Sequence, residues 1–196
     1  MREVFGRWRT HPGWVVVALG VSPILLHLPA TLLEVALGGQ PARWFYPPDQ
    51  PELVAGLVMF SLGEEFGWRG FAYPRLVQRH GPVVGSVLLG SVWGLWHLGM
   101  MFTADKGAPG LWEVPYACLT LALSSVVWAW FLERSNRSLA VAICLHAGAH
   151  LDKVSRAPES EVRLRALRFS VLVVVAGLAA YSLSHQRDRK QAAQGQ

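Results

Sequence analysis

The chain of 196 residues is 52% hydrophobic and only 16% charged, and its mean hydropathy is +0.30. These values exclude an ordinary soluble domain and make a membrane protein the first expectation. The net charge of +5 does not indicate a nucleic-acid partner, because the basic residues lie in the gaps between apolar runs.

Apolar runs close to the ~20 residues that cross a bilayer recur along the chain. The first contains Pro23 and Pro29 and has no convincing cleavage site after it, so we expect a kinked membrane helix and not a signal peptide. The fold class predicted is all-α, a polytopic transmembrane helix bundle of about six membrane segments, the fifth of which is short or re-entrant. In chain order the segments are residues 14–33, 53–71, 82–102, 114–132, 139–151 and 169–183.

The loop charges predict a topology. Arginines precede the first run, follow the second and the fourth, and end the chain, which places both termini in the cytoplasm if six segments cross. The predicted loop 152–168 disagrees, because it would be external yet is rich in arginine and lysine. We expect an integral protein of a bacterial cytoplasmic membrane, with one membrane domain at 1–185 and a flexible polar tail at 186–196.

The second apolar run ends in the charged stretch GEEFGWRG at residues 63–70. In a helix, Glu65 and Arg69 are four residues apart on one face, the favoured order for an ion pair, whereas Trp68 takes that position relative to Glu64. Glu65 and Arg69 are therefore predicted to support the structure and Glu64 to handle protons. The plainer alternative is an interfacial ion pair with Glu64 reaching the headgroups.

Histidines in two later apolar runs favour a shared polar site. His97 follows Trp93 by four residues, and His146 and His150 share one helix face with small residues between them. A carboxylate and three imidazoles can activate water and stabilise an oxyanion, or can bind Zn²⁺, and the residues alone leave both chemistries open. The zinc motif HExxH does not occur.

These motifs resemble those of the CPBP family of intramembrane proteases, which includes the type II CAAX prenyl endopeptidases. The pattern EExxxR is matched by Glu64, Glu65 and Arg69; FxxxH is matched at His97, with Trp93 in the aromatic position. The third motif, a histidine usually followed four residues later by asparagine, is matched at His146 with His150 in the asparagine position. The resemblance covers a motif core of about 52–151.

The resemblance implies an intramembrane endopeptidase that acts on a peptide or protein substrate at the lipid bilayer. It further implies that Glu64 and His97 activate the attacking water, and that His146 and His150 support the oxyanion. A zinc ion on Glu64, His97, His146 and His150 is the alternative. Two other functions stay open: a non-catalytic immunity or scaffold protein, and a transporter that uses the same Glu and His side chains for protons or cations.

Overall fold

The computed structural model describes residues 8–48, 50–101, 111–151 and 162–194. These residues lie in helices and in the segments between them, and none of them lies in a strand, which confirms the predicted all-α class. The helices fall into two compact units, Met1–Gly70 with Phe131–Val174, and Phe71–Trp130 with Val175–Gln196. The single membrane domain stays a prediction.

The N-terminal apolar run forms a continuous helical stretch in three parts, α2 (Pro12–Gly20), η1 (Val21–His27) and α3 (Leu28–Ala36). The middle part is π-helical: the backbone N–H of Leu28 donates to the carbonyl of Pro23, five residues earlier. Proline has no N–H to donate to the preceding turn, so the helix is disturbed where the prolines predict a kink.

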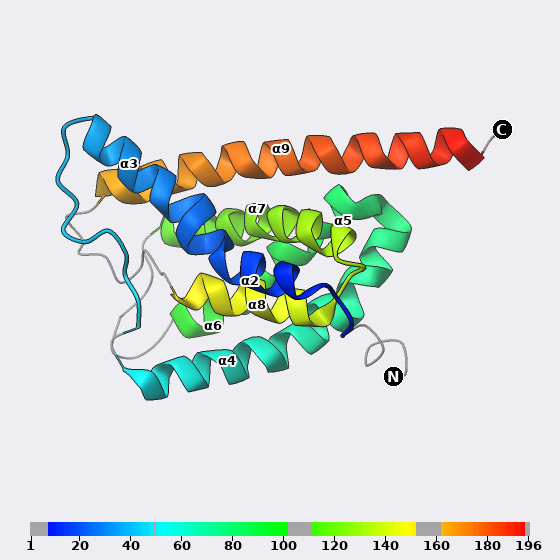
Figure 1. Cartoon of the computed structure of the whole chain (residues 1–196), viewed down its shortest axis with the longest axis horizontal. Helices are drawn as coiled ribbons and strands as arrows, with labels where there is room; N and C mark the ends of the chain where they lie inside the picture. The colour runs from blue at the N-terminus through cyan, green and yellow to red at the C-terminus, as the bar shows by residue number, and fades with distance from the viewer. Residues whose placement is uncertain (1–7, 49, 102–110, 152–161, 195–196) are drawn as a thin grey trace. The chain divides into compact units, whose positions relative to one another are not determined.

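The first unit is built around α8 (Leu139–Leu151). This helix packs against α2, η1 and α4 (Pro51–Glu65), and Figure 1 shows α2 and α8 side by side. The approach of α2 to α8 requires a glycine, because a Cβ on Gly148 would collide with the backbone carbonyl of Leu19. Small residues allow helix backbones to approach closely, and here they fix the position of the histidine helix.

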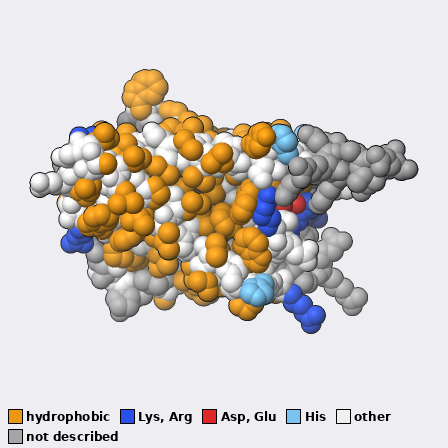
Figure 2. Space-filling model, turned by 45° about the horizontal axis from the view of Figure 1, so that its top comes forward, with side chains coloured by type: hydrophobic (Ala, Val, Ile, Leu, Met, Phe, Trp, Pro, Cys, Tyr) orange, Lys and Arg blue, Asp and Glu red, His pale blue; other side chains and the backbone are white. Residues whose placement is uncertain are grey.

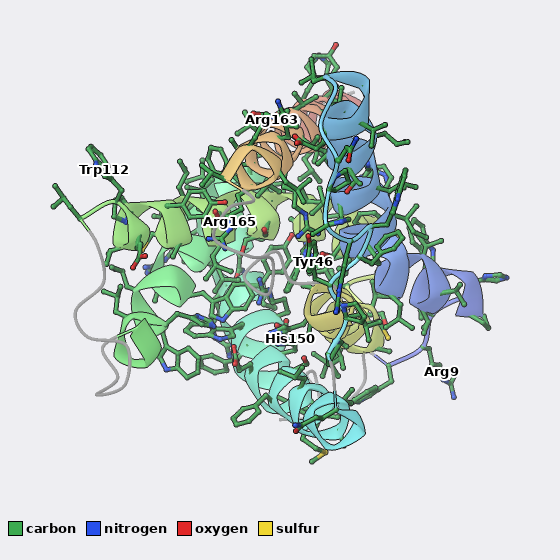
Figure 3. The ribbon with its side chains drawn as sticks, turned by 90° about the vertical axis from the view of Figure 1, so that its left-hand side faces the viewer. Arg9, Tyr46, Trp112, His150, Arg163 and Arg165 are labelled. Atoms are coloured by element: carbon green, nitrogen blue, oxygen red, sulfur yellow. The ribbon has the colours of Figure 1, made fainter. Side chains whose placement is uncertain are left out.

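The helix α9 (Val162–Gln194) includes residues 162–168, so the prediction of a loop at 152–168 is wrong for that part. The remainder, 152–161, lies outside the described residues. Arg163 holds the start of α9 to α3: its NH2 lies 2.6 Å from Oε1 of Glu34, and Figure 3 shows it at this end of α9. Leu164 is fully buried in the adjoining apolar cluster. These contacts hold residues 162–168 against α3 as part of α9.

The second unit contains α5 (Tyr73–Trp96), α6 (Leu98–Met101) and α7 (Glu113–Arg134) up to Trp130. Within α5 the backbone leaves the helical conformation at Gly81, where φ is 79°. Glycine tolerates this left-handed region, and a residue that precedes proline avoids the helical one. The predicted segment 82–102 therefore begins at a real break within a longer helical element.

The contact between α5 and α7 also depends on a small residue. A Cβ on Gly90 would lie 2.5 Å from Cα of Ala122, closer than side chains can approach backbone. One turn further along, the rings of Trp93 and Trp128 lie 5.3 Å apart and both side chains are buried. Trp93 thus packs in the core of the second unit.

Three of the helices described here are long and apolar enough to cross a membrane: Pro12–Ala36, Glu113–Arg134 and Val162–His185. They match the first, fourth and sixth predicted segments and indicate an integral membrane protein. Large apolar side chains are exposed on both units, and Figure 2 shows hydrophobic side chains over much of the surface in view. Exposure on this scale suits lipid better than water. The count of six segments stays a prediction.

The second, third and fifth predicted segments also lie in helices, but these helices are more polar or shorter than the three named above. The second corresponds to α4 and η2 (Phe66–Ala72), and the fifth is the 13-residue α8. At the C-terminus, α9 continues to Gln194, so the backbone of the predicted polar tail is helical up to that residue.

Candidate active site

The charged motif lies where α4 ends and η2 begins. Glu64 and Glu65 are the last two residues of α4, and Arg69 lies in η2, whose turns are π-helical. Wider turns of this kind are rare and are frequently found at functional sites. The motif therefore spans the point where the backbone changes from α-helical to π-helical turns.

The ion pair predicted from the sequence is present. NH1 of Arg69 donates to Oε1 of Glu65 over 2.8 Å, and the two side chains are 2% and 0% exposed. Removing one partner of such a pair leaves an uncompensated buried charge, which costs about 3–5 kcal/mol. The pair therefore holds α4 and η2 in one arrangement.

The same carboxylate contacts the histidine helix. Nδ1 of His146 lies 2.9 Å from Oε1 of Glu65, and both side chains are buried. An ionised carboxylate only accepts hydrogen bonds, so Nδ1 of His146 carries the proton and donates it. Sequence reasoning assigned Glu65 to Arg69 alone and missed this second partner, because no local spacing connects residues in different helices.

The other oxygen of Glu65, Oε2, is buried and has no hydrogen-bond partner among the described residues. Buried carboxylate oxygens are nearly always satisfied, by protein or by water. Oε2 is thus an acceptor that one further donor could reach, at the centre of the polar cluster formed by Glu65, Arg69 and His146.

His150 lies one turn after His146 on α8, as the four-residue spacing predicts. The two imidazole rings stack, with centroids 4.9 Å apart and an interplanar angle of 25°. His146 is buried and His150 is half-buried. Stacking places His150 against the ring that Glu65 orients, so the two histidines form one structural group.

Glu64 is half-buried at the end of α4, next to the fully buried Glu65. The two acids of the motif therefore differ in burial. Glu65 is enclosed with Arg69 and His146, whereas Glu64 keeps partial access to its surroundings.

His97 belongs to the second unit, where it follows the last residue of α5. Its Nδ1 lies 2.8 Å from the carbonyl oxygen of Trp93, and its ring lies against those of Trp93 and Trp96 at centroid distances of 5.4 and 5.1 Å. A carbonyl only accepts, so Nδ1 carries the proton and Nε2 is the nitrogen with a lone pair. The convergence of His97 with Glu64, His146 and His150 stays a prediction.

The candidate ligands of the first unit do not form a zinc site by themselves. Within the described part of the chain, no three His, Cys, Asp or Glu side chains gather closely enough to hold a metal ion. Nδ1 of His146 is also engaged with Glu65, and Glu65 with Arg69. We therefore derive no chemical step through a metal.

Comparison with known proteins matches the part of the chain that contains these motifs. The sequence model of the type II CAAX prenyl endopeptidase Rce1-like family matches residues 49–151, just over half of the chain. A CAAX prenyl protease 2 from Methanococcus maripaludis is 24% identical over 173 residues, which are 83% of this chain and 62% of that protein. The chain thus spans less than two thirds of that relative. The matched region contains both glutamates, Arg69 and all three candidate histidines, and the chain belongs to the Rce1-like family of type II CAAX prenyl endopeptidases.

Proposed function

We propose that this protein is an intramembrane endopeptidase that hydrolyses a peptide bond with a water molecule activated by Glu64 and His97. His146 and His150 stabilise the oxyanion. The observation that best supports the proposal is the hydrogen bond between Glu65 and His146, which brings the first and third motifs together in one buried cluster. Buried charged and polar groups in a membrane protein are costly and usually serve a function.

Water activation is assigned to the acid that is less enclosed. Glu64 accepts a proton from water while the water oxygen attacks the carbonyl carbon of the scissile bond. Glu64 then returns the proton to the leaving amine as the carbon–nitrogen bond breaks. His97 positions the water through Nε2, the nitrogen that its contact with the carbonyl of Trp93 leaves as an acceptor.

Oxyanion stabilisation is assigned to the stacked histidines. Glu65 accepts from Nδ1 of His146 and thereby fixes the orientation of the ring. With both ring nitrogens protonated, Nε2 donates to the oxyanion while Nδ1 keeps its bond to Glu65. Arg69 holds the carboxylate in place.

The experiment that tests the proposal is a peptide-cleavage assay on the full chain in proteoliposomes. A library of quenched fluorescent peptides should be cleaved by the wild-type protein, and Glu64→Gln should lower the rate by about 10²–10⁴-fold. The matched control is Glu113→Gln, which changes an exposed acid at the start of α7 and should leave the rate unchanged. Glu64-dependent flux of protons or Zn²⁺ without cleavage would support a transporter, and an intact phenotype in Glu64→Gln would support a scaffold.

A further inference from the structure

Residues 37–48 connect α3 to α4, and we refer to them as the strap. Figure 1 shows this connection in cyan where α3 ends, close to the start of α9. The strap directly follows Pro12–Ala36, which is long and apolar enough to cross a membrane, and the second such helix, Val162–His185, begins beside it. The strap therefore lies where two candidate membrane helices have their ends.

An ion pair fixes these two helix ends at one level. NH2 of Arg163, in the first turn of α9, lies 2.6 Å from Oε1 of Glu34, in the last turn of α3. The side chain of Arg163 is 54% exposed, although that of Glu34 is only 8% exposed. A long basic side chain at the end of a membrane helix places its charge among the lipid headgroups. Both helices thus pass from hydrocarbon to headgroups at the level of this pair.

The strap is attached to the first unit at two points. A Cβ on Gly39 would collide with the carboxylate of Glu34 and with NH2 of Arg163, so the backbone passes directly over the ion pair. Further along, Tyr46 is 3% exposed and packs in the apolar cluster that contains Leu164. These contacts hold the strap at the level of the two helix ends.

Between these points the strap exposes aromatic rings and a cation. Trp44 is 47% exposed, Phe45 is 39% exposed, and Arg43 before them is also exposed. Leu37 and Val162, at the two helix ends, are 61% and 68% exposed. Tryptophan is enriched at membrane–water interfaces, where its ring lies in an apolar layer and its N–H reaches polar groups. The exposed side chains of the strap therefore suit the headgroup region better than water.

We propose that the strap is an interfacial anchor that binds phospholipid: Trp44 and Phe45 insert at the boundary between headgroups and acyl chains, and Arg43 contacts the phosphates. The occupant is assigned from continuity, because these residues adjoin the ends of two helices long and apolar enough to cross a bilayer. Bound in this way, the strap fixes the depth of the first unit in the bilayer. The proposal concerns lipid binding and goes beyond the proposed peptide cleavage.

The first test locates Trp44 by fluorescence of the full chain in nanodiscs. The spectrum of Trp44→Phe is subtracted from that of the wild-type protein, which leaves the emission of Trp44. Phosphatidylcholine brominated near the headgroup should quench this emission about twofold more strongly than lipid brominated near the chain end, because interfacial indoles stay at headgroup level. Iodide in the water should quench it weakly.

Trp128→Phe is the matched control. Trp128 is 4% exposed in the core of the second unit, so its emission should be quenched little by either lipid. Quenching of Trp44 by iodide but by neither lipid would place the ring in water, and quenching by none of the three reagents would place it under protein. Strongest quenching by the chain-end lipid would place it in the hydrocarbon. Each of these three results would overturn the proposal.

The second test measures the access of a protease to the strap. Trypsin cuts after Arg43, and an anchored strap must leave the interface before it can be cut. In phosphatidylcholine nanodiscs the double variant Trp44→Ser/Phe45→Ser should be cut at Arg43 about tenfold faster than the wild-type protein, because it binds the interface less tightly. In lipid-free amphipol the two proteins should be cut at similar rates.

Trp112→Ser is the control for this test. Trp112 is 79% exposed and lies outside the strap, so its variant should be cut at Arg43 as slowly as the wild-type protein. The proposal fails if the wild-type protein is cut equally fast in nanodiscs and in amphipol, or if the double variant is cut faster in amphipol as well. Neither test requires the protein to cleave a peptide, so the result does not depend on the proposed endopeptidase activity.

Discussion

Nδ1 of His146 lies 2.9 Å from Oε1 of Glu65, although 81 positions separate the two residues in the chain. The same oxygen accepts from Arg69, so one buried carboxylate joins the end of α4, η2 and α8. A buried oxygen with two donors, one of them a guanidinium, fixes these elements more firmly than either contact would alone.

Arg69→Ala should destabilise the fold strongly, because it leaves Glu65 buried without its cation. We expect a loss of about 3–5 kcal/mol in the free energy of unfolding, measured by denaturation in mixed micelles. Arg79→Ala, at an exposed position of α5, is the control and should change the stability little. Equal stability of the two variants would contradict the structural role of the pair.

Gly148→Ala should separate α8 from α2. The added Cβ meets the backbone carbonyl of Leu19, which has no flexible end that could move aside. Overpacking of this kind costs about 1–3 kcal/mol, and displacement of His146 should also lower cleavage. Gly177→Ala on α9 has no atom within 4 Å of the new Cβ and serves as the control, so thermal unfolding of the two variants should differ clearly.

His150 stands where the related motif usually has asparagine, so its substitution distinguishes a hydrogen-bond donor from a general packing group. His150→Asn should keep cleavage within about tenfold of the wild-type rate, because the amide can still donate. His150→Ala should lose about 10²–10³-fold in kcat, as removal of an oxyanion donor does elsewhere. Similar kcat values for the two variants would argue against this role.

Chelation should not affect cleavage. No set of three suitable ligands gathers among the described residues, and His146 already donates to Glu65. Cleavage before and after EDTA, together with elemental analysis of the purified protein, checks this. Stoichiometric zinc whose removal abolishes cleavage and whose return restores it would make His150 a ligand instead of a donor.

Local spacing predicts the structure well where the interaction is local. The i, i+4 rule finds the Glu65–Arg69 pair, and the same spacing places His146 and His150 on one face of α8. Local spacing cannot predict the hydrogen bond between Glu65 and His146, because the two residues lie in different helices. The position of α8 depends on tertiary packing, including its close contact with α2 at Gly148.

The positions of basic residues predict the loops less well than the i, i+4 spacings predict the contacts within helices. The loop charges predict that Arg163 lies in a connecting loop, but Arg163 pairs with Glu34, Leu164 is buried, and both residues belong to α9. A basic residue is a weaker sign of a loop when it pairs with an acidic residue in another helix. The sequence does not reveal such a pair, because the partners are far apart in the chain.

The central claim is that Glu64 and His97 act on the same water. A double-mutant cycle on kcat for peptide cleavage, with Glu64→Gln, His97→Asn and the combined variant, tests it most directly. Residues that act as a unit give losses that do not multiply, so the combined variant should be about as slow as the slower single variant. Losses that multiply, or a single variant that keeps the wild-type kcat, would contradict the account.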